Sequence, residues 1–455
     1  KSCRYGTYLT SKLLPIASNK VLWEENMMKT LAISTSILAL ASSAALAGGL
    51  DRSGQSISAI FSAPGSTSVS FGTVKPSIKG SDTAGNSYNV GDAYQQYGYS
   101  FTGGKADAFS YALIIDQPYG ANVTYGNSPL TSTLGGTMAD LSSHAATVVG
   151  RYALSSRFSV LGGISVETVE GTVNLNGTAY RGAISAAAVT KGFNASLPSG
   201  ATELSSATLG AAALGDTTAQ TAIDTAYGAG TFTTLAGQLA TTATNFATND
   251  GYKFNMKQDT SVGFLLGAAY EIPDIALRLA ASYRFETDHS AATTESMLGL
   301  SSVPGTVDYV TPQSFNLDFQ TGVAKNTLLT ANFRWTDFSA VDVAPTLLGS
   351  DLVDIDDSYR YSIGVAHRFS DQFAGTVSLS YEEAGNAATV SPLGPTDGLY
   401  GLTVGGRYSK NNVNISGGLN YTWLGAANAG VGGQTAASFG SNSAVGAGLK
   451  IEIVF

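Results

Sequence analysis

The stretch Leu449-Lys450-Ile451-Glu452-Ile453-Val454-Phe455 decides the fold. Residues 449, 451, 453 and 455 are apolar, and Lys450 and Glu452 lie between them. Successive side chains of a β-strand point to opposite faces, so this pattern predicts a strand with one apolar and one polar face. Strands of this kind are typical of transmembrane β-barrels, in which one face meets lipid and the other meets a polar interior.

The same alternation recurs upstream, always within short segments. We expect further strands near 69–79, 94–102, 109–116, 145–154, 158–170, 262–272, 275–286, 315–320, 329–335, 359–369, 376–381, 400–408 and 412–423. The total is about 14, an even number, as bacterial barrels of one chain require. Aromatic residues fall at the strand ends, where the membrane interfaces would lie. The sequence therefore predicts an all-β fold, a transmembrane antiparallel β-barrel, rather than a soluble sandwich or propeller.

Loop lengths give an independent indication of the same fold. Short links alternate with long ones, and the long ones lie near 80–93, 117–144, 171–260, 288–312, 337–358, 383–398 and 425–443. Short periplasmic turns and long extracellular loops are the outer-membrane pattern. We therefore expect a cell outer membrane location in a Gram-negative bacterium, with barrel assembly machinery recognising the aromatic residue Phe455.

Composition agrees with a barrel and excludes several classes of protein. Of 455 residues, only 13% are charged, about half the usual fraction in soluble domains, whereas Gly contributes 53 and Tyr 22. The net charge of −9 and the lack of a basic patch argue against nucleic acid as a partner. A single Cys excludes a disulfide framework.

The N-terminal region reads as a leader. Met27-Met28-Lys29, an apolar run and Ala45-Leu46-Ala47 have the order of a secretory signal peptide, which we place at 27–47. Residues 1–26 resemble no targeting element. We interpret them as an over-extended gene start or an expression artefact.

The longest expected loop, 171–260, is extracellular and low in complexity. It is rich in Ala, Thr, Gly, Leu and Ser and carries almost no charge between 183 and 250. Thr217–Tyr227 and Leu235–Phe246 could form short helices that collect an apolar ligand. A flexible surface loop is the alternative.

The chemistry of an enzyme or a metal site is not visible in the sequence. His144, His289 and His367 are scattered and match no paired-ligand spacing, so we predict no catalytic residue, metal or cofactor. One expected outer loop carries four acids, Asp351, Asp354, Asp356 and Asp357, without the spacing of an EF-hand. They form either a solvated acidic loop or a site for a divalent ion that bridges to lipopolysaccharide.

Several short motifs, in this order along the chain, resemble the FadL-type family of outer-membrane long-chain fatty acid and hydrocarbon transporters. Ala59-Ile60-Phe61 matches the stretch that ends the N-terminal plug of that family, and Ala63-Pro64-Gly65 stands where Asn-Pro-Ala is expected. Tyr119-Gly120 is similar to the Tyr-Gly after the third strand of the family. Further similarities are Ala280–Glu286, Phe333–Phe338 and Pro395–Asp397.

The resemblance implies a plug at 48–66 inside the lumen of a barrel formed by 67–455. Ile60, Phe61 and Pro64 would belong to the plug, and Pro118 and Gly120 would interrupt strand pairing at a lateral opening. The ligand would be a long-chain fatty acid or a similar hydrophobic small molecule, taken up passively. Outer-membrane lipid and lipopolysaccharide would surround the barrel.

A desolvated fatty acid carboxylate needs a cation or hydrogen-bond donors, whereas each buried CH₂ of the tail contributes about 0.8 kcal/mol. Candidates for the cation are Arg181, which lies past a strand in the large loop, and Arg284 and Arg334, which have lumen parity. The other arginines with lumen parity are Arg278, Arg360, Arg368 and Arg407. Each could instead pair with a wall acid such as Asp318 or Glu286. Asp342 stands where the family has a basic residue, which leaves a neutral hydrocarbon open as substrate.

Two other functions stay open. A general diffusion porin would need an open polar lumen, which the expected plug argues against. A structural or adhesive barrel would act at the cell surface through the 171–260 loop.

Overall fold

The computed structural model describes residues 50–455. The expected extension at 1–26, the expected signal peptide at 27–47 and residues 48–49 of the expected plug lie outside the described residues.

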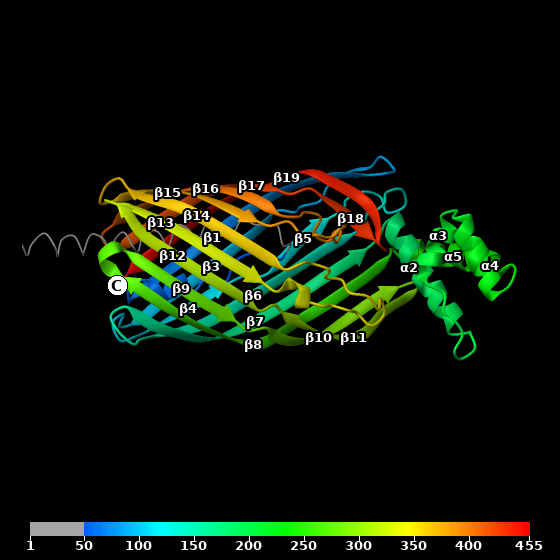
Figure 1. Cartoon of the computed structure of the whole chain (residues 1–455), viewed down its shortest axis with the longest axis horizontal. Coiled ribbons are helices and arrows are strands. Elements are labelled where there is room, and N and C mark those ends of the chain that lie inside the picture. Colours follow the sequence, from blue (N-terminus) through cyan, green and yellow to red (C-terminus); the bar gives the residue numbers. More distant parts are fainter. Residues whose placement is uncertain (1–49) are drawn as a thin grey trace, which may run out of the picture.

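Fourteen antiparallel strands form a closed barrel whose long axis is horizontal in Figure 1. They are β1 (Ser66–Asp82), β3 (Tyr94–Gly104), β4 (Phe109–Asp116), β6 (Met138–Ala153), β7 (Phe158–Leu175), β8 (Tyr252–Ile272), β9 (Leu277–Arg284), β12 (Ser314–Ala324), β13 (Thr327–Thr336), β14 (Ser358–Arg368), β15 (Phe373–Glu382), β16 (Leu399–Lys410), β17 (Val413–Leu424) and β19 (Gln434–Val454). The last strand pairs with the first, in a register that sets Val69 opposite Ile451. The predicted barrel and its number of strands are confirmed.

Five further strands lengthen the barrel wall at one end. They are β2 (Ser87–Asn89), β5 (Gly120–Thr124), β10 (Thr287–Met297), β11 (Leu300–Thr311) and β18 (Ala427–Val431). The expected loops at 288–312 and 425–443 are therefore wrong, because β10–β11 and β18–β19 are paired hairpins. Small and polar residues dominate both faces of these hairpins, so the apolar alternation that reveals the other strands is weak there.

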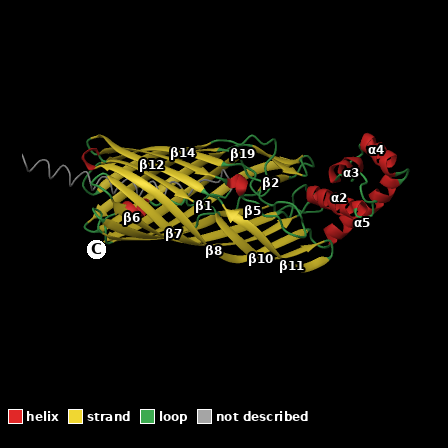
Figure 2. Cartoon of the chain, turned by 60° about the horizontal axis from the view of Figure 1, so that its bottom comes forward, coloured by secondary structure: helices red, strands yellow, loops and turns green. Residues whose placement is uncertain are grey.

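Four helices extend beyond the same end of the barrel, which we call the helix end (Figures 1 and 2). They are α2 (Thr178–Asn194), α3 (Ser206–Ala213), α4 (Thr217–Tyr227) and α5 (Thr231–Thr248), and they confirm both expected helical stretches. Their apolar side chains pack mainly on one another, around Leu209, Ile223 and Leu235. Within the described residues, no helix is both long and apolar enough to cross a membrane.

The opposite end, which we call the turn end, carries the short links between strands. One of them contains the 3-10 helix η3 (Pro273–Ile275). A second 3-10 helix, η4 (Phe338–Ala340), opens the long connection from β13 to β14 at the helix end. This contrast between the two ends is the pattern that the loop lengths predicted.

The two faces of the wall differ as the alternation predicts. Large apolar side chains such as Phe71, Phe264 and Leu419 are exposed on the outside. Outward aromatic rings follow one another across neighbouring strands near their ends, with centroid distances of 5.1 Å for Phe333–Tyr361 and 5.1 Å for Tyr381–Tyr400. The six arginines with lumen parity are all buried on the inside, which confirms their predicted face.

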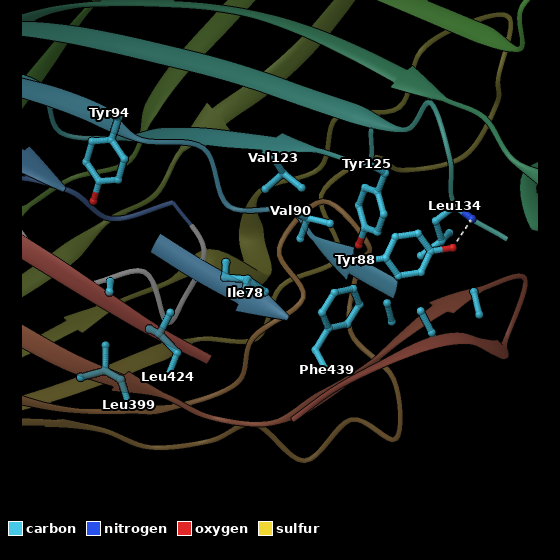
Figure 3. Packing of buried hydrophobic residues seen from close by; sticks show 14 of the residues in the cluster. Ile78, Tyr88, Val90, Tyr94, Val123, Tyr125, Leu134, Leu399, Leu424 and Phe439 are labelled. Atoms are coloured by element: carbon cyan, nitrogen blue, oxygen red, sulfur yellow. Dashed lines mark hydrogen bonds between the residues drawn. The ribbon is translucent and has the colours of Figure 1, made fainter. Parts of the chain in front are cut away.

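At the helix end, loops and strand ends pack around three buried rings (Figure 3). The Tyr88 ring lies edge-on to Tyr125 at 5.2 Å and stacks on Phe439 at 6.2 Å. The Tyr88 hydroxyl donates to Asp82 at 2.6 Å, and the Tyr125 hydroxyl donates to the Pro392 carbonyl at 2.8 Å. This cluster fixes one side of the barrel mouth.

Candidate functional site

Residues 50–65, which we call the N-terminal segment, pack against the inner wall of the barrel. Ile57 and Ile60 are almost completely buried, and Ile60 belongs to the 3-10 helix η2 (Ser58–Phe61). They contact inward-facing apolar side chains of β4, β6, β7, β8 and β9, namely Ala112, Ile114, Val149, Leu161, Leu265, Ala269 and Ala280. Burial of these two isoleucines holds η2 on the wall.

Charged groups anchor the start of this segment. Arg334 of β13 donates from Nε to Asp51 Oδ2 at 2.7 Å and from Nη2 to the Gln55 side-chain oxygen at 3.2 Å. Arg360 of β14 lies 4.0 Å from the same Asp51 oxygen and pairs with Glu382 of β15 at 2.6 Å. Burial alone would raise the pKa of Asp51, but the two arginines outweigh it and hold the pKa below its usual value.

The other residues expected in the plug have distinct positions. The half-buried ring of Phe61 faces two guanidinium groups of the wall, with Arg278 at 4.3 Å and Arg151 at 5.2 Å from its centroid. Pro64 lies in the turn that leads into β1. The next residue, Gly65, exchanges backbone hydrogen bonds with Phe455 and Thr102, so this turn is tied to the turn end.

The barrel wall is interrupted between β3 and β4. β3 pairs with β4 only from Tyr99 to Gly104, and β4 ends at Asp116. Residues 117–120 turn instead to the N-terminal segment: the Pro118 carbonyl accepts from Arg52 N at 2.8 Å, and Gly120 N donates to the Leu50 carbonyl at 2.9 Å. A Cβ at Gly120 would lie 2.5 Å from the Arg52 guanidinium carbon, so a larger residue here would require the Arg52 side chain to move.

A hollow lies in the wall at this interruption, and we call it the wall hollow. It encloses about 820 Å³ of empty space, part of it open to solvent. Inward-facing Gln96 and Lys450 line it together with outward-facing Phe71, Tyr97 and Tyr99. Ser53, Ser56, Ser58 and Ala59 of the N-terminal segment also line it. The lining of the hollow therefore includes residues from both the inner and the outward-facing side of the wall.

A larger cavity, which we call the mouth cavity, lies at the helix end. It encloses about 1250 Å³ of empty space, again partly open to solvent. Its apolar walls come from strands and from two loops, with Leu141, Val173, Phe254 and Met256 on the strand side and Val343, Leu352, Val390 and Leu393 on the loop side. Leu50 of the N-terminal segment contributes to its lining. The size and lining suit a small hydrophobic ligand.

Carboxylates hold the 337–357 loop that forms one side of the mouth cavity. Asp351 accepts from Val343 N at 2.8 Å and from Val353 N at 2.9 Å. Asp357 accepts from Ser339 N and from Trp335 Nε1, each at 3.1 Å. Burial alone would raise the pKa of Asp357, but the hydrogen bonds that it accepts, chiefly from Ser339 and Trp335, together outweigh burial and hold the pKa below its usual value. Within residues 50–455, no group of His, Cys, Asp and Glu is arranged to hold a metal ion.

The three arginines considered as partners of a ligand carboxylate lie in different parts of the structure. Arg334 is engaged by Asp51, whereas Arg284 of β9 is buried in the lumen, where the charges of Asp116 and Glu167 act on it. Arg181 lies on α2, at the helix end. Of the expected acid partners, Asp318 accepts from Asn332 at 2.9 Å. Glu286 is exposed, because the connection between β9 and β10 interrupts the alternation there.

The sequence analysis did not identify three polar residues that the structure places at this site, namely Asp51, Gln55 and Gln117. Asp51 and Gln55 bind Arg334, and Gln117 accepts from the Tyr97 backbone N–H at 3.0 Å across the wall hollow. The one available signal was the Asp51-Arg52 pair, which stands out in a weakly charged region.

Comparison with known proteins agrees with this geometry. The family described as "Outer membrane protein transport protein (OMPP1/FadL/TodX)" matches residues 98–444, more than half of the chain. A FadL homologue from Pseudomonas aeruginosa is similar in structure, with a TM-score of 0.60 and 13% identity over 92% of this chain and 98% of that chain. No match is found among curated proteins.

Two solved toluene transporters share the fold as well. TodX from Pseudomonas putida has a TM-score of 0.58 and 14% identity over 93% of this chain and 98% of its own. TbuX from Ralstonia pickettii has a TM-score of 0.53 and 15% identity over 87% of this chain and 90% of its own. At these identities the similarity to solved structures shows a shared fold.

Proposed function

The chain belongs to the OMPP1/FadL/TodX family of outer membrane transport proteins, and on this premise we propose that it takes up long-chain fatty acids or similar hydrophobic small molecules passively. In this proposal the helix end faces the cell exterior, and the N-terminal segment is a plug that closes the lumen to water and ions.

One observation carries the proposal: the N-terminal segment lines both the mouth cavity and the wall hollow. Leu50 lines the mouth cavity, and Ser53, Ser56, Ser58 and Ala59 line the wall hollow. A ligand would bind in the mouth cavity, pass along the segment and leave sideways between β3 and β4. In this proposal, movement of the segment would join the two spaces, because residues of the same segment line both of them.

The driving force is a concentration gradient together with transfer out of water. Each buried CH₂ stabilises the bound ligand by about 0.8 kcal/mol, so a long tail needs no precise chemistry to bind the apolar walls. The aromatic rim of the wall hollow would release the ligand at the lipid surface. Outer-membrane lipid and lipopolysaccharide are the expected surroundings, and the assembly machinery would recognise the barrel through Phe455.

Conductance and ligand binding test the proposal together. The purified barrel is inserted into planar bilayers, and oleate binding is measured on the same preparation by calorimetry. Small conductance with saturable oleate or hydrocarbon binding supports a plugged transporter. Large, steady conductance without binding of any apolar ligand would establish a diffusion porin instead.

A further inference from the structure

The ionisable side chains that line the mouth cavity are all acidic. Among the described residues the cavity lining includes Asp140, Asp354, Asp356, Asp357, Glu383 and Asp397, and no Lys, Arg or His. One more acid, Glu382, lines the cavity but is paired with Arg360 at 2.6 Å.

Two arginines that interact with acids of this lining, Arg52 with Asp140 and Arg360 with Glu382, do not line the cavity themselves and are engaged by other groups. Arg52 donates to the Asn122 side-chain oxygen at 2.6 Å and stacks over the Tyr94 ring at 3.9 Å. Arg360 is held by Glu382 and by Asp51. A ligand carboxylate in the mouth cavity would therefore lose its hydration without gaining a counter-charge from the lining.

The acids divide into two groups with different roles. Asp357 binds Ser339 N, Asp397 binds Gly385 N at 2.7 Å, and Asp140 binds the Asn122 amide at 2.9 Å, so these three shape the cavity. Asp354, Asp356 and Glu383 are exposed at its edge. The apolar cavity is what indicates a ligand, and the carboxylates decide which charge that ligand can carry.

We infer that the mouth cavity selects hydrophobic ligands by charge, binding apolar cations such as alkylammonium ions best, neutral apolar molecules less well and carboxylates least. The tail of an apolar cation would lie on Leu141, Phe254 and Met256, and its ammonium group would remain at the rim near Asp354 and Asp356. The inference rests on the proposed function and defines the ligand class of the same cavity.

Three ligands that share an eight-carbon chain but differ in the charge of the head group test this order of affinities. Octylammonium, octan-1-ol and octanoate are titrated by calorimetry into the full barrel in a non-ionic detergent at pH 7, with the heat of transfer into detergent alone subtracted. At low salt we expect octylammonium to bind at least about tenfold more tightly than octanoate, with octanol between them. At about 1 M salt the Debye length falls to about 3 Å, so the ratio should shrink.

A pair of variants locates the source of the selectivity. Asp354→Asn/Asp356→Asn should reduce the ratio of octylammonium to octanoate affinity severalfold and leave octanol binding unchanged. The matched control, Asp107→Asn/Asp371→Asn, removes two exposed acids in the short links at the turn end and should leave the ratio as in the parent. Heat-dependent mobility on gels checks that each variant is folded.

The possible failures are distinguishable. Saturable binding of all three ligands with octanoate equal or tighter would overturn the charge selection alone. An unchanged ratio in Asp354→Asn/Asp356→Asn would overturn it too, because the rim acids would not be its cause. If none of the three ligands binds but oleate does, the inference fails and the proposed function stands, whereas the absence of oleate binding as well would contradict both.

Discussion

Asp51 and Arg334 form a buried ion pair at 2.7 Å although 283 residues separate them in the sequence. Asp51 lies in the N-terminal segment and Arg334 on β13, so the pair fastens the segment to the wall. Gln55 and Arg360 complete the same network. The position of the segment, and with it the state of the lumen, depends on this contact.

Removing the cation should therefore loosen the segment. In Arg334→Ala the buried Asp51 loses its closest counter-charge, a change that typically costs about 3–5 kcal/mol. We expect bilayer conductance to rise and proteases to cleave within residues 50–65. Glu452→Gln is the matched control, because it breaks a buried pair, Arg407–Glu452 at 3.0 Å, that lies wholly within the wall. Equal conductance in both variants would show that the Asp51 pair does not hold the segment.

A larger side chain at Gly98 should obstruct the wall hollow. A Cβ there would lie 2.7 Å from the Ser70 hydroxyl and 3.4 Å from the Ile115 carbonyl. A leucine would fill part of the hollow, and a rise of about 1 kcal/mol in the barrier to passage would make uptake about fivefold slower in Gly98→Leu. Binding to the mouth cavity should be unchanged. The control is Gly418→Leu, a lumen-facing position of β17 whose Cβ would only touch its neighbours. Normal uptake in Gly98→Leu would exclude this route.

The hydrogen bonds of Asp357 should make the 337–357 loop sensitive to acid. Because its pKa is lowered in the folded protein, its stabilising contribution is fully present above the unfolded pKa of about 3.9 and is lost as pH falls through the lower folded value. The indole of Trp335 donates to this carboxylate, so its fluorescence reports the change. In a Trp23→Phe/Trp423→Phe background, we expect a transition with its midpoint below pH 3.9.

The corresponding variant completes that test. Asp357→Asn should show the altered Trp335 emission already at neutral pH and lack the acid transition, whereas Asp371→Asn should behave like the parent. A transition that persists in Asp357→Asn would have to come from another group.

The barrel should fold without its helices. Leu175 pairs with Tyr252, so deleting residues 178–249 leaves a short link through Gly177 and Asp250, both of which already have positive φ. We expect the shortened chain to form a heat-modifiable barrel and to retain uptake. Its thermal stability should fall, because Ile184 and Phe246 pack on the mouth. Loss of cell adhesion with intact uptake would indicate a surface role for the helices, and loss of folding would contradict the prediction.

Local alternation allowed much of the fold to be predicted. The polarity of each residue relative to its neighbours predicted where most strands lie and that Arg284 and Arg334 face the lumen. The lengths of the segments between the strands predicted the alternation of short turns and long loops. The hairpins β10–β11 and β18–β19 were not predicted, because both of their faces carry small and polar residues and the apolar alternation that indicates a strand is weak there.

By itself, then, the sequence determined the barrel, its approximate number of strands and the sidedness of its wall, since strand alternation is a local property of neighbouring residues. The tertiary structure decided which arginine Asp51 binds, where β3 and β4 separate, and that the carboxylates near Asp140, Asp354 and Glu383 share one apolar cavity. These are contacts between residues far apart in the chain. They form only when the barrel closes. Strand alternation allows each of these residues many partners, and the free energy of burying particular side chains and charges together decides which partner it contacts.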